Sequence, residues 1–182
     1  MKNLIIIFIS IVFINTAFAQ NMKTLYDFKA TTIDGKPYDF SQLKGKKVLI
    51  VNTASKCGHT PQYKDLEELF KIYGGSRFTI IGFPANNFLK QEPGTNQEIS
   101  EFCTKNYGVT FQMMSKISVK GDDIDPLYKW LTQKSENGVI DAKVTWNFQK
   151  FLIDQNGNVV GSVAPKENPK CDEIINWIKQ YK

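Results

Sequence analysis

The chain has 182 residues, of which 42% are hydrophobic and 13% aromatic, so it suits one globular domain and is too short for two ordinary ones. Its formal net charge of +5 is spread over scattered lysines, which is typical of a solvated surface and gives no reason to expect nucleic-acid binding. Three cysteines are too few for a disulfide scaffold and allow one disulfide with one thiol left over.

The first 19 residues have the organisation of a secretory signal peptide. Lys2 supplies a basic start, residues 4–14 form a short apolar run, and Ala17-Phe18-Ala19 is a small-residue cleavage pattern. A membrane anchor is the weaker alternative, because a spanning helix needs roughly 20 apolar residues. We therefore expect cleavage after Ala19, a mature domain over residues 20–182, a periplasmic or secreted location, and no stable membrane insertion.

A hairpin and a buried strand are the first expected elements of the mature chain. Apolar and polar residues alternate over residues 25–40 on both sides of Asp34-Gly35, which predicts a β-hairpin. Residues 48–51 are continuously apolar. Such a run predicts a strand buried on both faces, as in the centre of a parallel sheet.

The middle of the chain predicts a helix, a strand and a second helix. Apolar residues recur at helical spacing from Leu66 to Tyr73 and stop at Gly74-Gly75. Residues 78–81 form another buried-strand pattern. Thr95 and Glu98 have the spacing of a capping box, which begins a helix with Cys103 on its apolar face.

The last third predicts a helix, a hairpin and a closing helix. Asp125-Pro126 is a helix-start signal, residues 151–160 have a hairpin pattern, and an apolar helical face runs from Ile174 to Ile178. This order fits a three-layer α/β/α domain with a mixed central sheet and an N-terminal β-hairpin. A thioredoxin-like fold is the natural candidate.

Cys57 is the candidate nucleophile. It follows a buried strand and precedes a helix, where free N–H groups and the helix dipole favour a thiolate. Position alone leaves a buried structural thiol equally open.

Three separate blocks resemble the glutathione peroxidase family. They run from Val51 to Tyr63, from Gly82 to Gly94 and from Val144 to Leu152, in the family's order, and the similarity covers nearly all of residues 23–180. The resemblance implies a thioredoxin-like fold and reduction of hydrogen peroxide and organic hydroperoxides. It also implies that Cys57 is the residue that attacks the peroxide and becomes a sulfenic acid.

The resemblance implies three further active-site side chains. Trp146 and Asn147 would donate N–H groups toward the sulfur and the developing oxyanion. Asn87 stands where the family usually has Gln, in a run whose usual Cys is replaced by Ala85. Because Asn keeps the amide but is one methylene shorter, we expect it to contribute as a weaker donor or through a bridging water. Gln91, in the same block, is assigned no role.

Periodicity alone makes Cys103 a small core residue. The resemblance instead implies a resolving role, in which Cys103 forms a disulfide with oxidised Cys57 and a thioredoxin-like dithiol protein or glutathione is the reductant. His59, the only histidine, is interpreted as a polar loop residue rather than one that tunes the thiolate. Cys171 matches no motif.

Two alternatives to a peroxidase acting in the response to oxidative stress stay open. They are a thiol-based peroxide sensor and a general disulfide oxidoreductase on the same fold, although Cys57 lacks the Cys-x-x-Cys partner of the latter. The sequence contains no zinc, haem or nucleotide motif, so no cofactor is expected. Residues 130–146 are short compared with tetrameric members of the family, so a monomer is expected.

Overall fold

The computed structural model describes residues 22–180, and the expected signal peptide lies outside them. The strands are β1 (Lys29–Thr31), β2 (Pro37–Asp39), β3 (Lys47–Thr53), β4 (Phe78–Pro84), β5 (Gln112–Met113), β6 (Lys150–Ile153) and β7 (Val159–Val163). The α-helices are α1 (Gln62–Tyr73), α2 (Asn96–Tyr107), α3 (Pro126–Thr132), α4 (Lys134–Asn137) and α5 (Asp172–Lys179), and two 3-10 helices are η1 (Leu25–Asp27) and η2 (Phe40–Leu43).

A five-stranded mixed sheet forms the centre of the molecule, in the order β5-β4-β3-β6-β7. β3 pairs in parallel with β4 and antiparallel with β6, so two different kinds of neighbour flank the strand that leads to Cys57. Every residue of β3 is buried, which confirms the prediction of a buried strand at the apolar run of residues 48–51. β1 and β2 form the expected hairpin as a separate two-stranded sheet.

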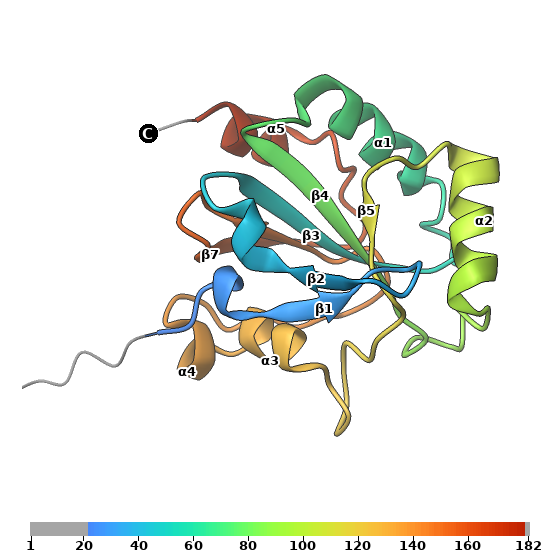
Figure 1. Cartoon of the computed structure of the whole chain (residues 1–182), viewed down its shortest axis with the longest axis horizontal. Helices are drawn as coiled ribbons and strands as arrows, with labels where there is room; N and C mark the ends of the chain where they lie inside the picture. The colour runs from blue at the N-terminus through green and yellow to red at the C-terminus, as the bar shows by residue number, and fades with distance from the viewer. Residues whose placement is uncertain (1–21, 181–182) are drawn as a thin grey trace, which may run out of the picture.

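Helices cover both faces of the sheet, which gives the three layers expected from the sequence. Figure 1 shows α1 and α5 on one face, α3 and α4 on the other, and α2 beside the β5 edge. Alternate strand residues enter two apolar clusters, because successive side chains point to opposite faces. Leu49 and Val51 of β3 join the cluster under α1, α2 and α5, while Val48 and Ile50 join the cluster that includes α3.

The ends of α2 are fixed by its own sequence. At the N-terminus, Thr95 and Glu98 form the predicted capping box. At the C-terminus, Gly108 takes a left-handed conformation with φ of 61°, which glycine adopts at little cost. Just beyond it, buried Glu67 of α1 accepts hydrogen bonds of 2.7 Å from both the N–H and the hydroxyl of Thr110. α2 is therefore a helix of 12 residues with a defined cap at each end.

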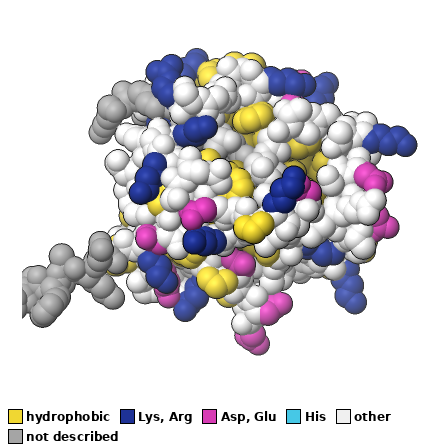
Figure 2. Space-filling view, viewed as in Figure 1, with side chains coloured by type: hydrophobic (Ala, Val, Ile, Leu, Met, Phe, Trp, Pro, Cys, Tyr) yellow, Lys and Arg dark blue, Asp and Glu magenta, His cyan; other side chains and the backbone are white. Residues whose placement is uncertain are grey.

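The described surface carries mixed charge. Figure 2 shows basic and acidic side chains interspersed over one face, which agrees with scattered lysines rather than a basic groove. Within residues 22–180, no helix is both long and apolar enough to cross a membrane.

Candidate active site

Cys57 lies in the loop that connects β3 to α1. Its side chain is nearly buried, and its sulfur accepts a hydrogen bond from the backbone N–H of His59 at 3.4 Å. Thr60 fixes this loop, because its Oγ accepts from the Cys57 N–H at 3.0 Å and donates to the Ala54 carbonyl at 2.8 Å. Cys57 is thus placed in the turns that lead into α1, and the backbone of His59, not its imidazole, is the group that contacts the sulfur.

A tight turn beginning at Trp146 is fastened to the end of β3. Asn52 donates through Nδ2 to the Trp146 carbonyl at 3.2 Å, and its own carbonyl accepts from the Phe148 N–H at 2.6 Å. Phe148 has φ of +70°, a conformation that costs a bulky residue on the order of 1 kcal/mol or more. The Trp146 ring packs on Phe88, with ring centroids 5.3 Å apart, and borders the apolar cluster that contains Cys57.

Asn147 is fully buried and is joined to Gln91. Its Nδ2 donates to Oε1 of Gln91 at 2.9 Å, and its Oδ1 has no partner within the described residues. The backbone of Gln91 in turn accepts from the N–H of Lys56 at 3.0 Å, one residue before Cys57. Gln91 therefore links the predicted donor Asn147 to the Cys57 loop.

Asn87 is exposed, and its whole side-chain amide is engaged by residues 118–120. Nδ2 donates to Ser118 Oγ and to the Lys120 carbonyl, each at 2.8 Å, and Oδ1 accepts from the Val119 N–H at 2.9 Å. An amide has only two N–H groups, so this arrangement leaves none to donate to Cys57. These contacts do not support the expected donor role of Asn87, which stays a prediction for substitution to test.

Cys103 lies on the inner face of α2, almost completely buried, and belongs to the same apolar cluster as Cys57. Both thiols are free in the structure. Burial raises the pKa of Cys103 to about 11; the Tyr63 hydroxyl beside it acts in the opposite direction, and the Glu92 carboxyl raises it further. Cys103 is therefore a protonated, poorly nucleophilic thiol while α2 is packed.

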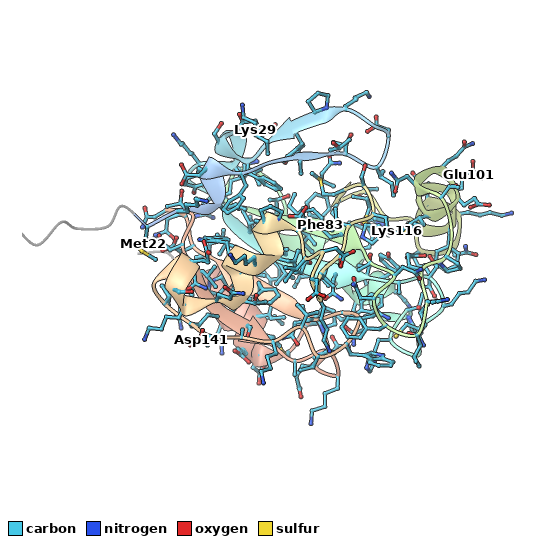
Figure 3. All side chains as sticks on the ribbon, turned by 90° about the horizontal axis from the view of Figure 1, so that it is seen from below. Met22, Lys29, Phe83, Glu101, Lys116 and Asp141 are labelled. Carbon is cyan, nitrogen blue, oxygen red and sulfur yellow. The ribbon has the colours of Figure 1, made fainter. Side chains whose placement is uncertain are left out.

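A cavity of about 380 Å³ lies between the Cys57 loop and α2. Residues 55–56 and 92–94 line one part of it, and Ile99 and Phe102 of α2 line another. Figure 3 shows Glu101 projecting from the outer side of the same helix, away from the body of the molecule. The inner side of α2 thus borders open space next to the segment that carries Cys57.

Glu92 contributes a buried carboxyl group to this cavity. Burial raises its pKa, and Ser55, Lys116 and Lys56 nearby offset part of the increase. Neither carboxyl oxygen has a hydrogen-bond partner within the described residues. Lys116, labelled in Figure 3, instead donates to the backbone carbonyls of Glu92 and Gly94 and so fixes the loop.

The structure thus brings Cys57, Trp146 and Asn147 to one end of the sheet and places Cys103 in the cluster beneath it. Asn52, Thr60 and Gln91 support them and were not identified from the sequence. Asn52 could have been identified from the sequence, because it is a polar residue that directly follows the apolar run of β3. Gln91 could not, because its partner is 56 positions away.

The arrangement is suited to thiol chemistry. The Cys57 sulfur has a backbone N–H donor and lies at the end of the sheet where an amide and an indole group also lie, and such donors can stabilise charge that develops on sulfur or on a leaving oxygen. Within residues 22–180, no group of three or more His, Cys, Asp or Glu side chains is placed to hold a metal ion.

Sequence comparisons identify relatives over most of the chain. Residues 25–132 match the family described as glutathione peroxidase. Glutathione peroxidase-like peroxiredoxin 2 of Saccharomyces cerevisiae is 53% identical over 147 residues, which cover 80% of this chain and 90% of that protein. Glutathione peroxidase-like peroxiredoxin gpx1 of Schizosaccharomyces pombe is 49% identical over 150 residues, covering 82% and 94%.

Solved structures agree with these relatives. The crystal structure of Trgpx in apo form has a TM-score of 0.66 and 42% identity, and the match covers 87% of this chain and 97% of that one. A thioredoxin-family thiol:disulfide interchange protein from Chlorobium tepidum TLS has a TM-score of 0.58 at 24% identity, covering 82% and 90%, and confirms the thioredoxin-like fold. The match over more than half of the chain and the relatives near 50% identity together show that this chain belongs to the glutathione peroxidase family.

Proposed function

We propose that the protein is a thiol peroxidase that reduces hydrogen peroxide and organic hydroperoxides at Cys57. The thiolate sulfur attacks one peroxide oxygen, the O–O bond breaks, and the other oxygen leaves as hydroxide or alkoxide and takes up a proton. Cys57 is left as a sulfenic acid. The observation that carries this function is the contact of the buried Cys57 sulfur with a loop N–H, at the end of the sheet where Trp146 and Asn147 also lie.

Cys103 is the resolving thiol in this proposal. Its sulfur attacks the Cys57 sulfenic acid, a Cys57–Cys103 disulfide forms, and water leaves. Because burial keeps Cys103 protonated, with a pKa of about 11, part of α2 has to unpack before this step. The cavity beside α2 and the position of that helix beside the edge strand β5 favour such a local opening.

A thioredoxin-like dithiol protein is the proposed reductant. Its first thiolate attacks the disulfide to form a mixed disulfide, and its second thiol resolves that bond intramolecularly, whereas glutathione needs a second encounter. The curated relatives named peroxiredoxins are consistent with this choice. A role in the response to oxidative stress follows from peroxide removal.

The deciding experiment is an anaerobic titration of the reduced mature protein with hydrogen peroxide, followed by mass-spectrometric mapping. We expect one equivalent of peroxide to give a Cys57–Cys103 disulfide, and Cys103→Ser to accumulate sulfenic acid on Cys57 instead. Absence of that disulfide would refute the resolving role. Steady-state peroxide consumption with a thioredoxin as reductant separates a peroxidase, which turns over repeatedly, from a sensor, which stops after one oxidation.

The same proposal places the mature enzyme outside the cytoplasm, because residues 1–19 have a signal-peptide pattern. Its electron donor is then an exported thioredoxin-like protein. N-terminal sequencing of the protein recovered from each cell fraction tests this location, and a mature end at Gln20 is the expected result. Light scattering of the same material tests the proposed monomer.

A further inference from the structure

We infer that Gln91 is the positioning residue of the peroxide-reacting site, acting through Asn147, and that Asn87 has no part in that step. The inference deepens the proposed function and rests on it. It assigns to Gln91 the task of fixing the direction of a catalytic amide before peroxide arrives.

The hydrogen bond between Asn147 and Gln91 is what fixes that amide. It is the one side-chain hydrogen bond of Asn147 within the described residues, and it joins the fully buried Asn147 to the half-buried Gln91. The terminal torsion of an Asn side chain has only weak intrinsic preferences, so an unanchored amide samples many directions. With one N–H held by Gln91, the second N–H of Asn147 keeps a defined direction for charge that develops during the reaction.

Gln91 is itself anchored at the Cys57 loop. Its carbonyl accepts from the Lys56 N–H at 3.0 Å, and its own N–H donates to the Phe88 carbonyl at 3.1 Å. Gln91 therefore joins the loop that carries the nucleophile, through its backbone carbonyl, to the buried amide of Asn147, through its side chain. Support of this kind is what holds a reacting group within a fraction of an ångström of its productive position.

Asn87 provides a matched contrast within the same loop. Like Gln91, Asn87 has a side-chain amide. That amide makes three hydrogen bonds, and all of them are with residues 118–120. Its exposure differs as well, since Asn87 is exposed whereas Asn147 is fully buried. Removing Asn87 therefore perturbs the fold locally without releasing Asn147.

The test is a double-mutant cycle on the second-order rate of Cys57 oxidation by hydrogen peroxide, measured by stopped flow on the full mature chain. We expect Gln91→Ala to slow oxidation about tenfold, the scale of a misdirected donor rather than a lost one. Gln91→Met, which keeps the length but lacks the acceptor, should slow it equally. Asn87→Ala should stay within about threefold of the parent protein.

The rate of the double variant of Gln91 and Asn147 shows whether Gln91 positions Asn147 or only stabilises the fold. If Gln91 acts through Asn147, the variant carrying both Gln91→Ala and Asn147→Ala reacts no more slowly than Asn147→Ala alone. Independent, multiplying effects in that cycle would overturn the inference, as would an unchanged rate in both Gln91 variants. If Cys57→Ser still consumes peroxide, the proposed function fails instead. Gln91→Met supplies the measurement should Gln91→Ala fold poorly.

Discussion

Asn147 and Gln91 meet across the end of β3, where the Asn147 amide donates to the Gln91 side-chain carbonyl at 2.9 Å. The strand order of the mixed sheet explains why these two residues are in contact. Gln91 follows β4, which runs parallel to β3, and Asn147 precedes β6, which runs antiparallel on the other side of β3. The C-terminal end of β4 and the N-terminal end of β6 therefore lie at the same end of the sheet, where β3 leads into the Cys57 loop.

Replacement of single thiols should separate reacting from non-reacting cysteines. Cys57→Ser should abolish peroxide turnover, because a hydroxyl stays protonated at neutral pH and is a far weaker nucleophile. Cys171→Ser should leave turnover within about twofold of the parent, since Cys171 is only partly buried and lies at the start of α5, outside the Cys57 loop. Steady-state assays with a thioredoxin as reductant measure both. Peroxide turnover by Cys57→Ser would eliminate this cysteine as the nucleophile.

Asn87→Ala should act mainly on stability. The change removes three hydrogen bonds that hold residues 118–120 against the loop after β4. Because Asn87 is exposed and water replaces part of what is lost, we expect the free energy of unfolding to fall by about 1–2 kcal/mol. Urea denaturation measures this, and Lys90→Ala, nearby and also exposed, is the control. An unchanged midpoint would mean that these bonds contribute nothing net.

Cys103 should give the protein a specific alkaline instability. Burial raises the folded-state pKa of this thiol from 9.0 to about 11, so the folded state holds the proton more tightly than the unfolded state does. The contribution of this thiol to stability is complete below pH 9 and is lost as the pH rises toward 11. Between pH 8 and 10.5, the reduced parent protein should lose on the order of 2 kcal/mol more than Cys103→Ala. Equal losses in denaturation at the two pH values would argue against the burial described.

Weakening the cap of α2 should speed formation of the disulfide. Thr95→Ala removes the side-chain half of the capping box, which costs about 1 kcal/mol of helix stability. If α2 opens before Cys103 attacks, the rate from sulfenic acid to disulfide should rise up to about fivefold. Rapid acid quenching followed by non-reducing mass spectrometry measures that rate.

Thr24→Ala is the matched control for the cap, because Thr24 and Asp27 form the same type of cap on η1. It should leave the rate of disulfide formation unchanged. A slower reaction in Thr95→Ala would mean that an intact α2, not an opened one, delivers Cys103.

The sequence predicted the elements that have strong local signals. The buried run in β3, the capping box of α2 and the turn between β6 and β7 are each encoded within about ten residues, and each was found. β5 was missed because a two-residue strand exists only through its pairing with β4. α4, a single turn of four residues, was missed because its length gives no periodicity to detect.

Site residues were predicted where the family resemblance names them, and not where two residues come into contact only in the folded chain. Cys57, Trp146 and Asn147 lie at one end of the sheet because the strands that carry their loops are neighbours. For Asn87, the sequence shows the shorter side chain but not the three groups at Ser118, Val119 and Lys120 that engage it. Gln91 has no distinguishing local pattern, and its importance depends on a contact that the fold creates.

The order of the strands also bears on how such a chain can diverge. In the proposed mechanism, Cys57, Asn147 and its positioning residue Gln91 are carried by loops of the three central strands β3, β6 and β4, whereas Cys103 is carried by a helix that leads to the two-residue edge strand β5. Under that mechanism, substitutions in that helix change how oxidised Cys57 is reduced again and leave the loops that carry Cys57 and Asn147 in place. Descendants of one ancestral centre can therefore acquire new electron donors by changing a single peripheral segment.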